Sequence, residues 1–132
     1  MIRIAYRSKA TQPELALVSL ADIIAVSDRV NRRDGLSGGL LLSRGRFFQV
    51  LEGDEVDMDR ALLRICRDPR HHGVEIVFRA QVTRQLFRDW AMVAVQVTPD
   101  VGPLIDTAID MCNDAPVAAV ERLRALVERQ RR

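Results

Sequence analysis

Cysteine, lysine and aromatic residues are scarce in this chain of 132 residues. Its two cysteines, Cys66 and Cys112, stand far apart without metal-ligand spacing around them, which argues against a zinc site and favours reduced thiols in a cytosolic protein. No apolar run approaches the ~20 residues of a membrane-spanning helix, and the N-terminus lacks the long apolar region of a signal peptide. We therefore expect a cytoplasmic protein without a metal site and without a membrane partner.

A large excess of one charge is also missing. The chain carries 20 Lys and Arg residues against 18 Asp and Glu residues, which gives a net charge of +2. So small an excess gives no reason to expect nucleic acid as a partner. The arginine-rich residues 129–132 are expected to form a solvated tail.

The motifs of common enzyme classes are absent as well. Gly35, Gly38 and Gly39 do not have the spacing of a dinucleotide-binding or phosphate-binding loop. The two histidines have no evident zinc partners, and Ser8 and Ser43 belong to no nucleophile motif. The sequence therefore favours a protein that is not an enzyme.

The chain does contain 48% hydrophobic residues, enough for the core of one domain. Alternating and helical periodicities predict a β-α-β-β-α-β-β order followed by two helices, which is close to a ferredoxin-like α+β sheet. We expect residues 1–98 to form the domain and 99–132 a C-terminal helical extension for packing, oligomerisation or output. The apolar stripes of that extension suit either the free face of the sheet or a partner. The expected strands are 2–7, 36–43, 46–52, 74–83 and 91–98, and the expected helices are 19–33, 55–67 and two within 99–132.

Local signals set several of these boundaries. Ser19-Leu20-Ala21-Asp22 resembles a capping box at the start of the first helix, and Gly35 is expected just after its end. Arg44-Gly45 predicts a tight turn between the second and third strands. Asp54 is expected to cap the second helix, which ends at Asp68-Pro69.

One strand contains a polar residue in an apolar segment. Side chains alternate along a strand, so Gln49 shares a face with Phe47 and Leu51. If that face is buried, the amide needs partners, because an unpaired buried polar group costs roughly 1–3 kcal/mol. A half-exposed edge strand with Gln49 in water is the plainer interpretation. A buried amide, with two donors and an acceptor, would instead suit a polar planar ligand.

Other residues also combine a polar group with an apolar setting. Asn31 projects from the sheet-facing side of the first helix, although such an asparagine is more often a cap or a surface residue. Tyr6 is the chain's single tyrosine and fits a core position. Trp90 and Met92 are expected to share a face of the last strand, where a core role suffices for both. Residues 68–72 form a polar turn that is expected at the surface.

Together these residues resemble one family, the BLUF domains, which sense blue light using FAD. The resemblance runs from about residue 2 to about residue 95, and the order and spacing of its motifs make it specific. The motifs are Tyr6-Arg7-Ser8, Asn31 with Gly35-Leu36-Ser37-Gly38, Phe47-Phe48-Gln49-Val50-Leu51-Glu52-Gly53, Asp68-Pro69-Arg70-His71, Arg84, Phe87 and Asp89-Trp90-Ala91-Met92.

The resemblance implies non-covalently bound FAD, with FMN as the alternative. It implies that Tyr6 and Gln49 are the photoactive pair and that Asn31 holds a carbonyl edge of the flavin ring. Trp90 and Met92 would sense a change at Gln49. An amide suits such a switch, because rotation or tautomerisation exchanges its donor and acceptor with little change in volume. The residues expected to bind the cofactor are Tyr6, Ile23, Ile24, Asn31, Gln49, Leu51, Asp68, Arg70 and His71.

Output is then expected to pass through protein contacts, because the segment after residue 98 is too short for an effector domain. The resemblance implies a homo-oligomer, most simply a dimer, and a separate downstream signalling protein. Two alternatives remain open: a flavin-free ferredoxin-like regulatory binding module, and an acylphosphatase-like enzyme that uses an arginine and Asn31. A yellow protein with a blue absorption band would separate the flavoprotein from both.

Overall fold

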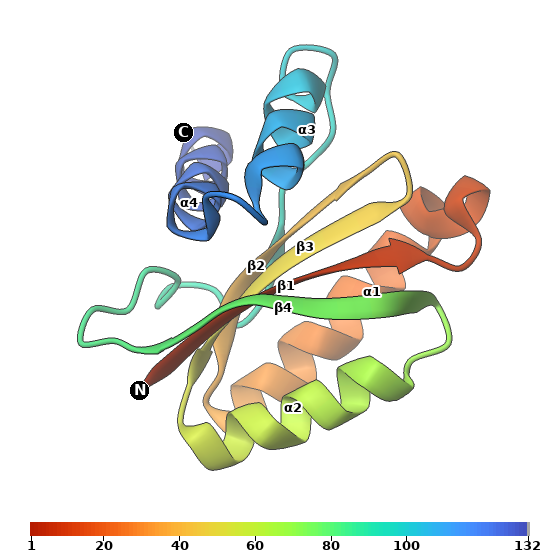
Figure 1. Cartoon of the computed structure of the whole chain (residues 1–132). Helices are drawn as coiled ribbons and strands as arrows, with labels where there is room; N and C mark the ends of the chain where they lie inside the picture. Colours follow the sequence, from red (N-terminus) through yellow and green to blue (C-terminus); the bar gives the residue numbers. More distant parts are fainter. Residues whose placement is uncertain (132) are drawn as a thin grey trace.

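The computed structural model describes residues 1–131 and arranges them as a five-stranded sheet between two pairs of helices (Figure 1). The strand order is β4-β1-β3-β2-β5, and neighbours are antiparallel except β2 and β5, which are parallel. The predicted ferredoxin-like α+β arrangement is confirmed. The strands are β1 (Ile2–Ala10), β2 (Ser37–Ser43), β3 (Arg46–Gly53), β4 (His71–Gln81) and β5 (Val93–Ala94). The helices are α1 (Pro13–Asp34), α2 (Glu55–Arg67), α3 (Gly102–Met111) and α4 (Pro116–Arg131).

The two helix pairs cover opposite faces of the sheet, α1 and α2 on one face and α3 and α4 on the other (Figure 1). Each face has a core of its own. Representative residues are Ile4, Leu51 and Met58 under α1 and α2, and Phe48, Ile105 and Leu123 under α3 and α4. The C-terminal helices thus pack on the chain's own sheet. Among residues 1–131, no helix has both the length and the apolar character needed to cross a membrane.

The ladder between β1 and β3 sets the position of two polar side chains. Its register places Tyr6 directly opposite Gln49, and Ile4 opposite Leu51. Partners directly opposite in an antiparallel pair have their Cβ atoms about 4.5–5.5 Å apart. The backbone pairing therefore puts Tyr6 and Gln49 side by side on the face covered by α1 and α2.

A two-residue turn joins β2 to β3, as the sequence predicts. Arg44 has a φ of 53° and Gly45 a φ of 71°, both in the left-handed region. Positive φ at both central positions characterises the type I′ turn, whose twist matches that of the flanking strands. Since the turn fixes the register of the hairpin, it also fixes which face carries Gln49, here paired with Leu40.

The first helix starts earlier than predicted. α1 begins at Pro13, so the capping box proposed at Ser19 was wrong. Pro13 stands in the first turn, where its fixed φ suits the helix and its missing N–H costs no bond, and the carboxylate of Glu14 favours the helix N-terminus. The predicted end is confirmed. Gly35 takes a φ of 71° there, and the following backbone N–H bonds back to the carbonyl of Asn31.

The second helix and the strand after it differ from prediction in detail. α2 has the predicted extent, but the side chain of Asp54 makes no capping hydrogen bond. The backbone carbonyl of Asp54 accepts a bond from the N–H of Met58 at 2.9 Å. β4 begins earlier than predicted because His71 pairs with Ala10, in the part of β1 that continues past its predicted end.

The last strand is much shorter than the one predicted over 91–98. β5 consists of Val93 and Ala94, which pair in parallel with β2. Trp90 and Met92 precede it and pack on opposite sides of the sheet, Trp90 toward α3 and α4 and Met92 toward α1. The prediction that they share a strand face was therefore wrong, because strand alternation does not extend to residues outside the ladder.

A side chain from α4 pairs with the outer edge of β5. The amide oxygen of Gln130 accepts a bond from the backbone N–H of Gln96 at 2.8 Å. Its Nε2 donates to the carbonyl of Ala94 at 3.0 Å. The two bonds resemble those a neighbouring strand would make, so the last turn of α4 is tied to the edge of the sheet.

Candidate functional site

A cavity of about 160 Å³ lies between α1, α2 and the sheet. Its lining comes from segments that are far apart in the sequence: β1, α1, the β2–β3 hairpin, α2 and the start of β4. The fold thus brings most of the predicted site residues together. The predicted residues that line the cavity are Tyr6, Ile23, Asn31, Gln49, Leu51, Asp68, Arg70 and His71.

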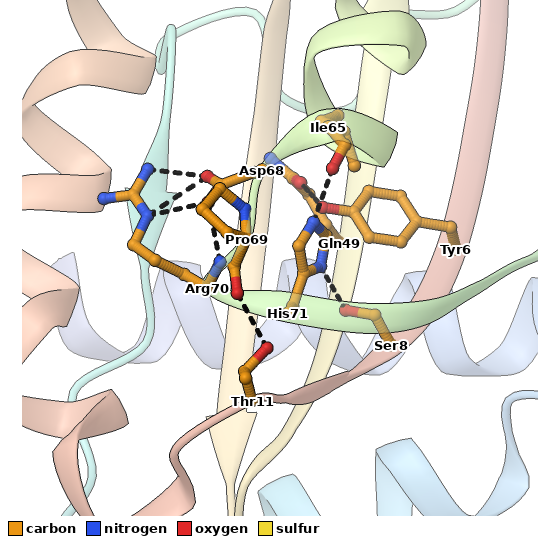
Figure 2. A network of polar contacts seen from close by, with 9 residues as sticks. All are labelled: Tyr6, Ser8, Thr11, Gln49, Ile65, Asp68, Pro69, Arg70 and His71. Atoms are coloured by element: carbon orange, nitrogen blue, oxygen red, sulfur yellow. Dashed lines mark hydrogen bonds and ion pairs between the residues drawn. The ribbon is translucent and has the colours of Figure 1, made fainter.

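Tyr6 and Gln49 form a buried hydrogen-bonded pair in the cavity wall. The hydroxyl of Tyr6 donates to Oε1 of Gln49 (Figure 2). Tyr6 is 4% exposed and Gln49 7% exposed, so the interpretation of Gln49 as a solvated edge residue was wrong. Burial raises the pKa of Tyr6 far above its ordinary value, and the nearby Asp68 and Cys66 raise it further. The phenol is therefore neutral and acts as a donor to the amide.

The other end of the Gln49 amide contacts Met92. Nε2 of Gln49 lies 3.6 Å from Sδ of Met92, and a thioether sulfur is a weak acceptor. The amide thus has a strong bond at its oxygen and a weak one at its nitrogen. Exchanging the two ends would turn the acceptor facing Tyr6 into a donor with little change in volume.

Asn31 lies in the last turn of α1 and is 4% exposed, so the alternatives of a cap or a surface residue were wrong. Its Nδ2 donates to the backbone carbonyl of Ala91 at 2.8 Å. Ala91 immediately precedes Met92 in the chain. Asn31 and Gln49 therefore contact adjacent residues of one segment, and both also line the cavity.

His71 joins three elements beside the pair (Figure 2). Its Nε2 lies 2.6 Å from the carbonyl oxygen of Ile65 at the end of α2, and its Nδ1 lies 2.7 Å from the hydroxyl of Ser8 on β1. A carbonyl only accepts, so Nε2 carries the proton and, in the neutral ring, Nδ1 accepts from Ser8. The ring meets Phe47 edge-on at 6.0 Å between centroids and lies 6.2 Å from Tyr6. His71 is thereby fixed in orientation.

Asp68 and Arg70 form a charged pair at the cavity wall (Figure 2). The carboxylate of Asp68 accepts the backbone N–H of Arg70 at 2.9 Å and its guanidinium at 3.0 and 2.6 Å. These bonds hold the pKa of Asp68 below its ordinary value, so it stays ionised. The turn is only partly the surface turn predicted: Arg70 is exposed, yet both residues also line the cavity.

The lining differs from the predicted set by the absence of Ile24 and by residues that were not predicted. Ile24 does not line this cavity; it borders a groove between α1 and β5, because one residue along a helix turns its side chain by about 100° from Ile23. The lining residues that were not predicted are Val26, Ser27, Val30, Leu40, Phe47, Ala61, Ile65 and Arg64. The charged residue among them is Arg64 of α2. Helical spacing could have found it, since Arg64 follows Ala61 by one turn and precedes Ile65, and both of these line the cavity.

Comparison with known proteins gives the site a family context. A sequence model described as sensors of blue-light using FAD (BLUF) matches residues 1–93. The photoactivated adenylate cyclase subunit beta of Euglena longa is 37% identical over 91 residues, which make up 68% of this chain and 11% of that protein. The chain therefore spans only about a tenth of the length of this relative.

Solved structures show the same fold over most of the chain. The structure of BlsA in its photo-activated state matches with a TM-score of 0.80 and 22% identity, covering 93% of this chain and 94% of that one. A bacterial light-regulated adenylyl cyclase matches with a TM-score of 0.73 and 28% identity, covering 89% of this chain and 35% of that one. Since the family model spans the segments that supply Tyr6, Asn31 and Gln49, this chain belongs to the BLUF family, the sensors of blue-light using FAD.

Proposed function

We propose that this chain binds a flavin in the cavity between α1 and α2 and signals blue light through Tyr6 and Gln49. The observation that carries the proposal is the buried pair itself, a tyrosine hydroxyl bonded to a glutamine amide in the wall of a cavity. Membership of a family of blue-light sensors supports it. FAD is the flavin that the family description names, and we propose it ahead of FMN.

The lining of the cavity fits a flavin ring. A flat ring with apolar faces and a polar edge needs apolar walls and a few convergent polar groups. Ile23 of α1 and Ile65 of α2 supply apolar walls, and Asn31 and Gln49 supply amides. An amide offers both a donor and an acceptor, which matches the alternating N–H and C=O groups along the pyrimidine edge of a flavin.

A bound flavin supplies absorption of blue light and an excited state that accepts an electron. Tyr6 would be the donor, since burial keeps its phenol protonated and its proton is directed at Oε1 of Gln49. Gln49 would keep the altered hydrogen bonding after the flash. Reversing its amide takes Oε1 away from the Tyr6 hydroxyl and turns the N–H that now faces Met92 toward another partner. A new bond from Gln49 to a flavin carbonyl would shift the absorption band to the red.

We further propose that the light signal passes to a separate signalling protein. That protein would contact residues 99–132, the segment before them, or both. One relative supports an output through a coupled activity, since it is a photoactivated adenylate cyclase subunit of which the matched segment makes up 11%. We also propose a homo-oligomer, most simply a dimer. The apolar stripes of α3 and α4 face the sheet, so the support for self-association lies in α1, where Leu17 and Val18 are exposed.

Absorption spectroscopy of purified protein tests the main proposal. We expect a yellow protein with a blue absorption band that shifts reversibly to the red on illumination. Heat release followed by chromatography distinguishes FAD from FMN and riboflavin. A colourless protein that takes up no added flavin, or a flavin-loaded protein whose spectrum does not change in blue light, would contradict the proposal.

A further inference from the structure

Glu52 is a buried carboxylate on the sheet face opposite the cavity. It is the residue after the cavity-lining Leu51, so strand alternation turns it toward α3 and α4. Its exposure is 0%. In the ladder it lies between Arg3 of β1 and Ser37 of β2. Fully buried carboxylates are rare unless they are paired, so its position calls for an explanation.

Two of the four hydrogen-bond partners of Glu52 come from the loop between β4 and β5, and the other two come from β1 and β2. Its Oε2 accepts the backbone N–H of Leu86 at 2.9 Å, and its Oε1 accepts the backbone N–H of Phe87 at 2.7 Å. Nε of Arg3 donates to Oε2 at 2.9 Å, and the hydroxyl of Ser37 lies 3.4 Å from Oε1. Each carboxylate oxygen therefore holds one of two consecutive backbone donors.

The two flanking side chains extend this anchor along the loop. Nη2 of Arg3 donates to the carbonyl of Arg84 at 2.7 Å. Nε2 of Gln85 donates to the hydroxyl of Ser37 at 2.8 Å. The backbone from residue 84 to residue 87 is thus fixed to β1, β2 and β3 around one negative charge.

Only a short segment separates this anchor from the cavity. The N–H of Trp90 donates to the carbonyl of Phe87 at 3.0 Å, and the carbonyl of Trp90 accepts the N–H of Gly38 at 3.0 Å. Ala91 then bonds to Asn31, and Met92 contacts Gln49. Residues 87–92 therefore lead from the anchor on one face of the sheet to the cavity on the other.

We infer that Glu52 is a positioning residue for the light response: it fixes the 84–87 backbone so that the segment behind it delivers Met92 to the amide of Gln49. The inference rests on the proposed function of Tyr6 and Gln49. A carboxylate suits the task because it offers two acceptor oxygens at a fixed spacing to two consecutive N–H groups. Glutamine of the same shape offers one acceptor oxygen. Since Glu52 does not line the cavity, it acts on the segment and not on the flavin.

Two variants and a matched control test this role. Glu52→Gln keeps the shape but leaves one backbone N–H facing an amide NH₂. Arg3→Lys keeps a cation beside Glu52 but loses the guanidinium that reaches the carbonyl of Arg84. The Arg3→Lys variant tests the same anchor if Glu52→Gln does not fold. Glu55→Gln is the control, because it removes the same charge from an exposed residue at the start of α2.

Two measurements on the 132-residue chain separate positioning from folding. The first is the rate of dark recovery after blue light, taken together with flavin affinity. The second is acrylamide quenching of Trp90, the chain's single tryptophan, which lies inside the segment. For Glu52→Gln we expect recovery about fivefold faster and quenching about twofold stronger, with flavin affinity within about twofold of wild type. Arg3→Lys should move both readouts in the same direction by less.

The outcomes are distinguishable. Recovery and quenching that stay at wild-type values in both variants, or that change as much in Glu55→Gln, would overturn the inference. Flavin affinity that falls in proportion to the faster recovery would also overturn it, because Glu52 would then stabilise the whole domain. If the wild-type protein shows no red shift, the proposed function fails, and Trp90 quenching still decides whether Glu52 holds the segment.

Discussion

The indole of Trp90 lies beneath the guanidinium of Arg131, with 5.3 Å between the guanidinium carbon and the ring centroid. Arg131 also bonds to Asp89 at 3.1 Å. Trp90 is thereby held on the side of α3 and α4, whereas Met92 reaches Gln49 on the other side of the sheet. The segment before β5 thus contacts both the cavity and the last turn of α4.

We predict that illumination changes hydrogen exchange in residues 86–96 and in α4 and leaves β1 and β3 unchanged. A change at Gln49 can move this region only if its two arrangements differ by a few kcal/mol or less. β5 has only two residues, and a side chain of α4 bonds to its outer edge, so few hydrogen bonds would have to change between the two arrangements. Exchange of dark and illuminated flavin-loaded protein checks this, and equal protection throughout 90–131 would rule out the route.

Gln49→Leu should keep the fold and most of the flavin but lose the red shift, because leucine has no donor or acceptor to exchange. The hydroxyl of Tyr6 loses its acceptor as well. Gln81→Leu, at the exposed end of β4, is the matched control and should respond normally. Difference spectra before and after blue light are the measurement. A normal red shift in Gln49→Leu would show that this amide does not carry the response.

Tyr6→Phe should retain flavin and lose the normal photocycle, because the donor beside Gln49 is gone. It also leaves a buried amide oxygen without its hydroxyl partner, which costs roughly 1–3 kcal/mol of unfolding free energy. Urea unfolding gives the stability change and transient absorption gives the photocycle. Photochemistry at the wild-type yield would exclude Tyr6 as the donor.

Asn31→Ala should weaken flavin binding about tenfold, equivalent to about 1.4 kcal/mol, because one amide of the cavity is removed. The substitution also frees the carbonyl of Ala91 from its bond to Nδ2. Asn113→Ala, beyond the end of α3, serves as the control. Flavin titration followed by fluorescence measures both variants, and equal affinities would remove Asn31 from the binding site.

The Asp68–Arg70 pair should make stability depend on pH in the acidic range. The bonds from Arg70 lower the pKa of Asp68 in the folded protein, so folding favours its ionised form. The resulting stabilisation is complete above the ordinary aspartate pKa of about 3.9 and is lost as the pH falls through the lower folded value. Unfolding free energies of wild type and Asp68→Asn should therefore converge with acidification below about pH 4. A gap that stays constant down to pH 2 would contradict this.

Much of the fold followed from local signals. The hairpin turn at Arg44-Gly45, the end of α1 at Gly35 and the inward face of Tyr6 and Gln49 are each set by backbone geometry or strand alternation. The start of α1 was predicted wrongly because the sequence offers two helix-start signals, Pro13 and the capping-box pattern at Ser19. The true start is Pro13, and Ser19 lies inside the helix.

The errors in the site concern residues outside regular elements or positioned by tertiary contacts. Trp90 and Met92 were assigned to one strand face, but the bonds of their segment to Gly38, Asn31 and Gln49 determine where they lie. Such bonds join residues that are far apart in the sequence and leave no periodicity to detect. The buried position of Glu52 was missed for the same reason, since the loop that covers it carries no pattern of its own.

The two edges of the sheet differ in how they resist pairing with another chain. The long edge, β4, carries the charged and exposed Glu75 and Arg79, whereas the short edge, β5, is occupied by the amide of Gln130. An unprotected strand edge is a template for aggregation, and charges or covering side chains remove that hazard. Copies of this chain that associate would therefore meet through the outer surfaces of the helices, since helices cover both faces of the sheet. Pairing of two sheets at β5 would first require the hydrogen bonds of Gln130 to the backbone of Ala94 and Gln96 to break.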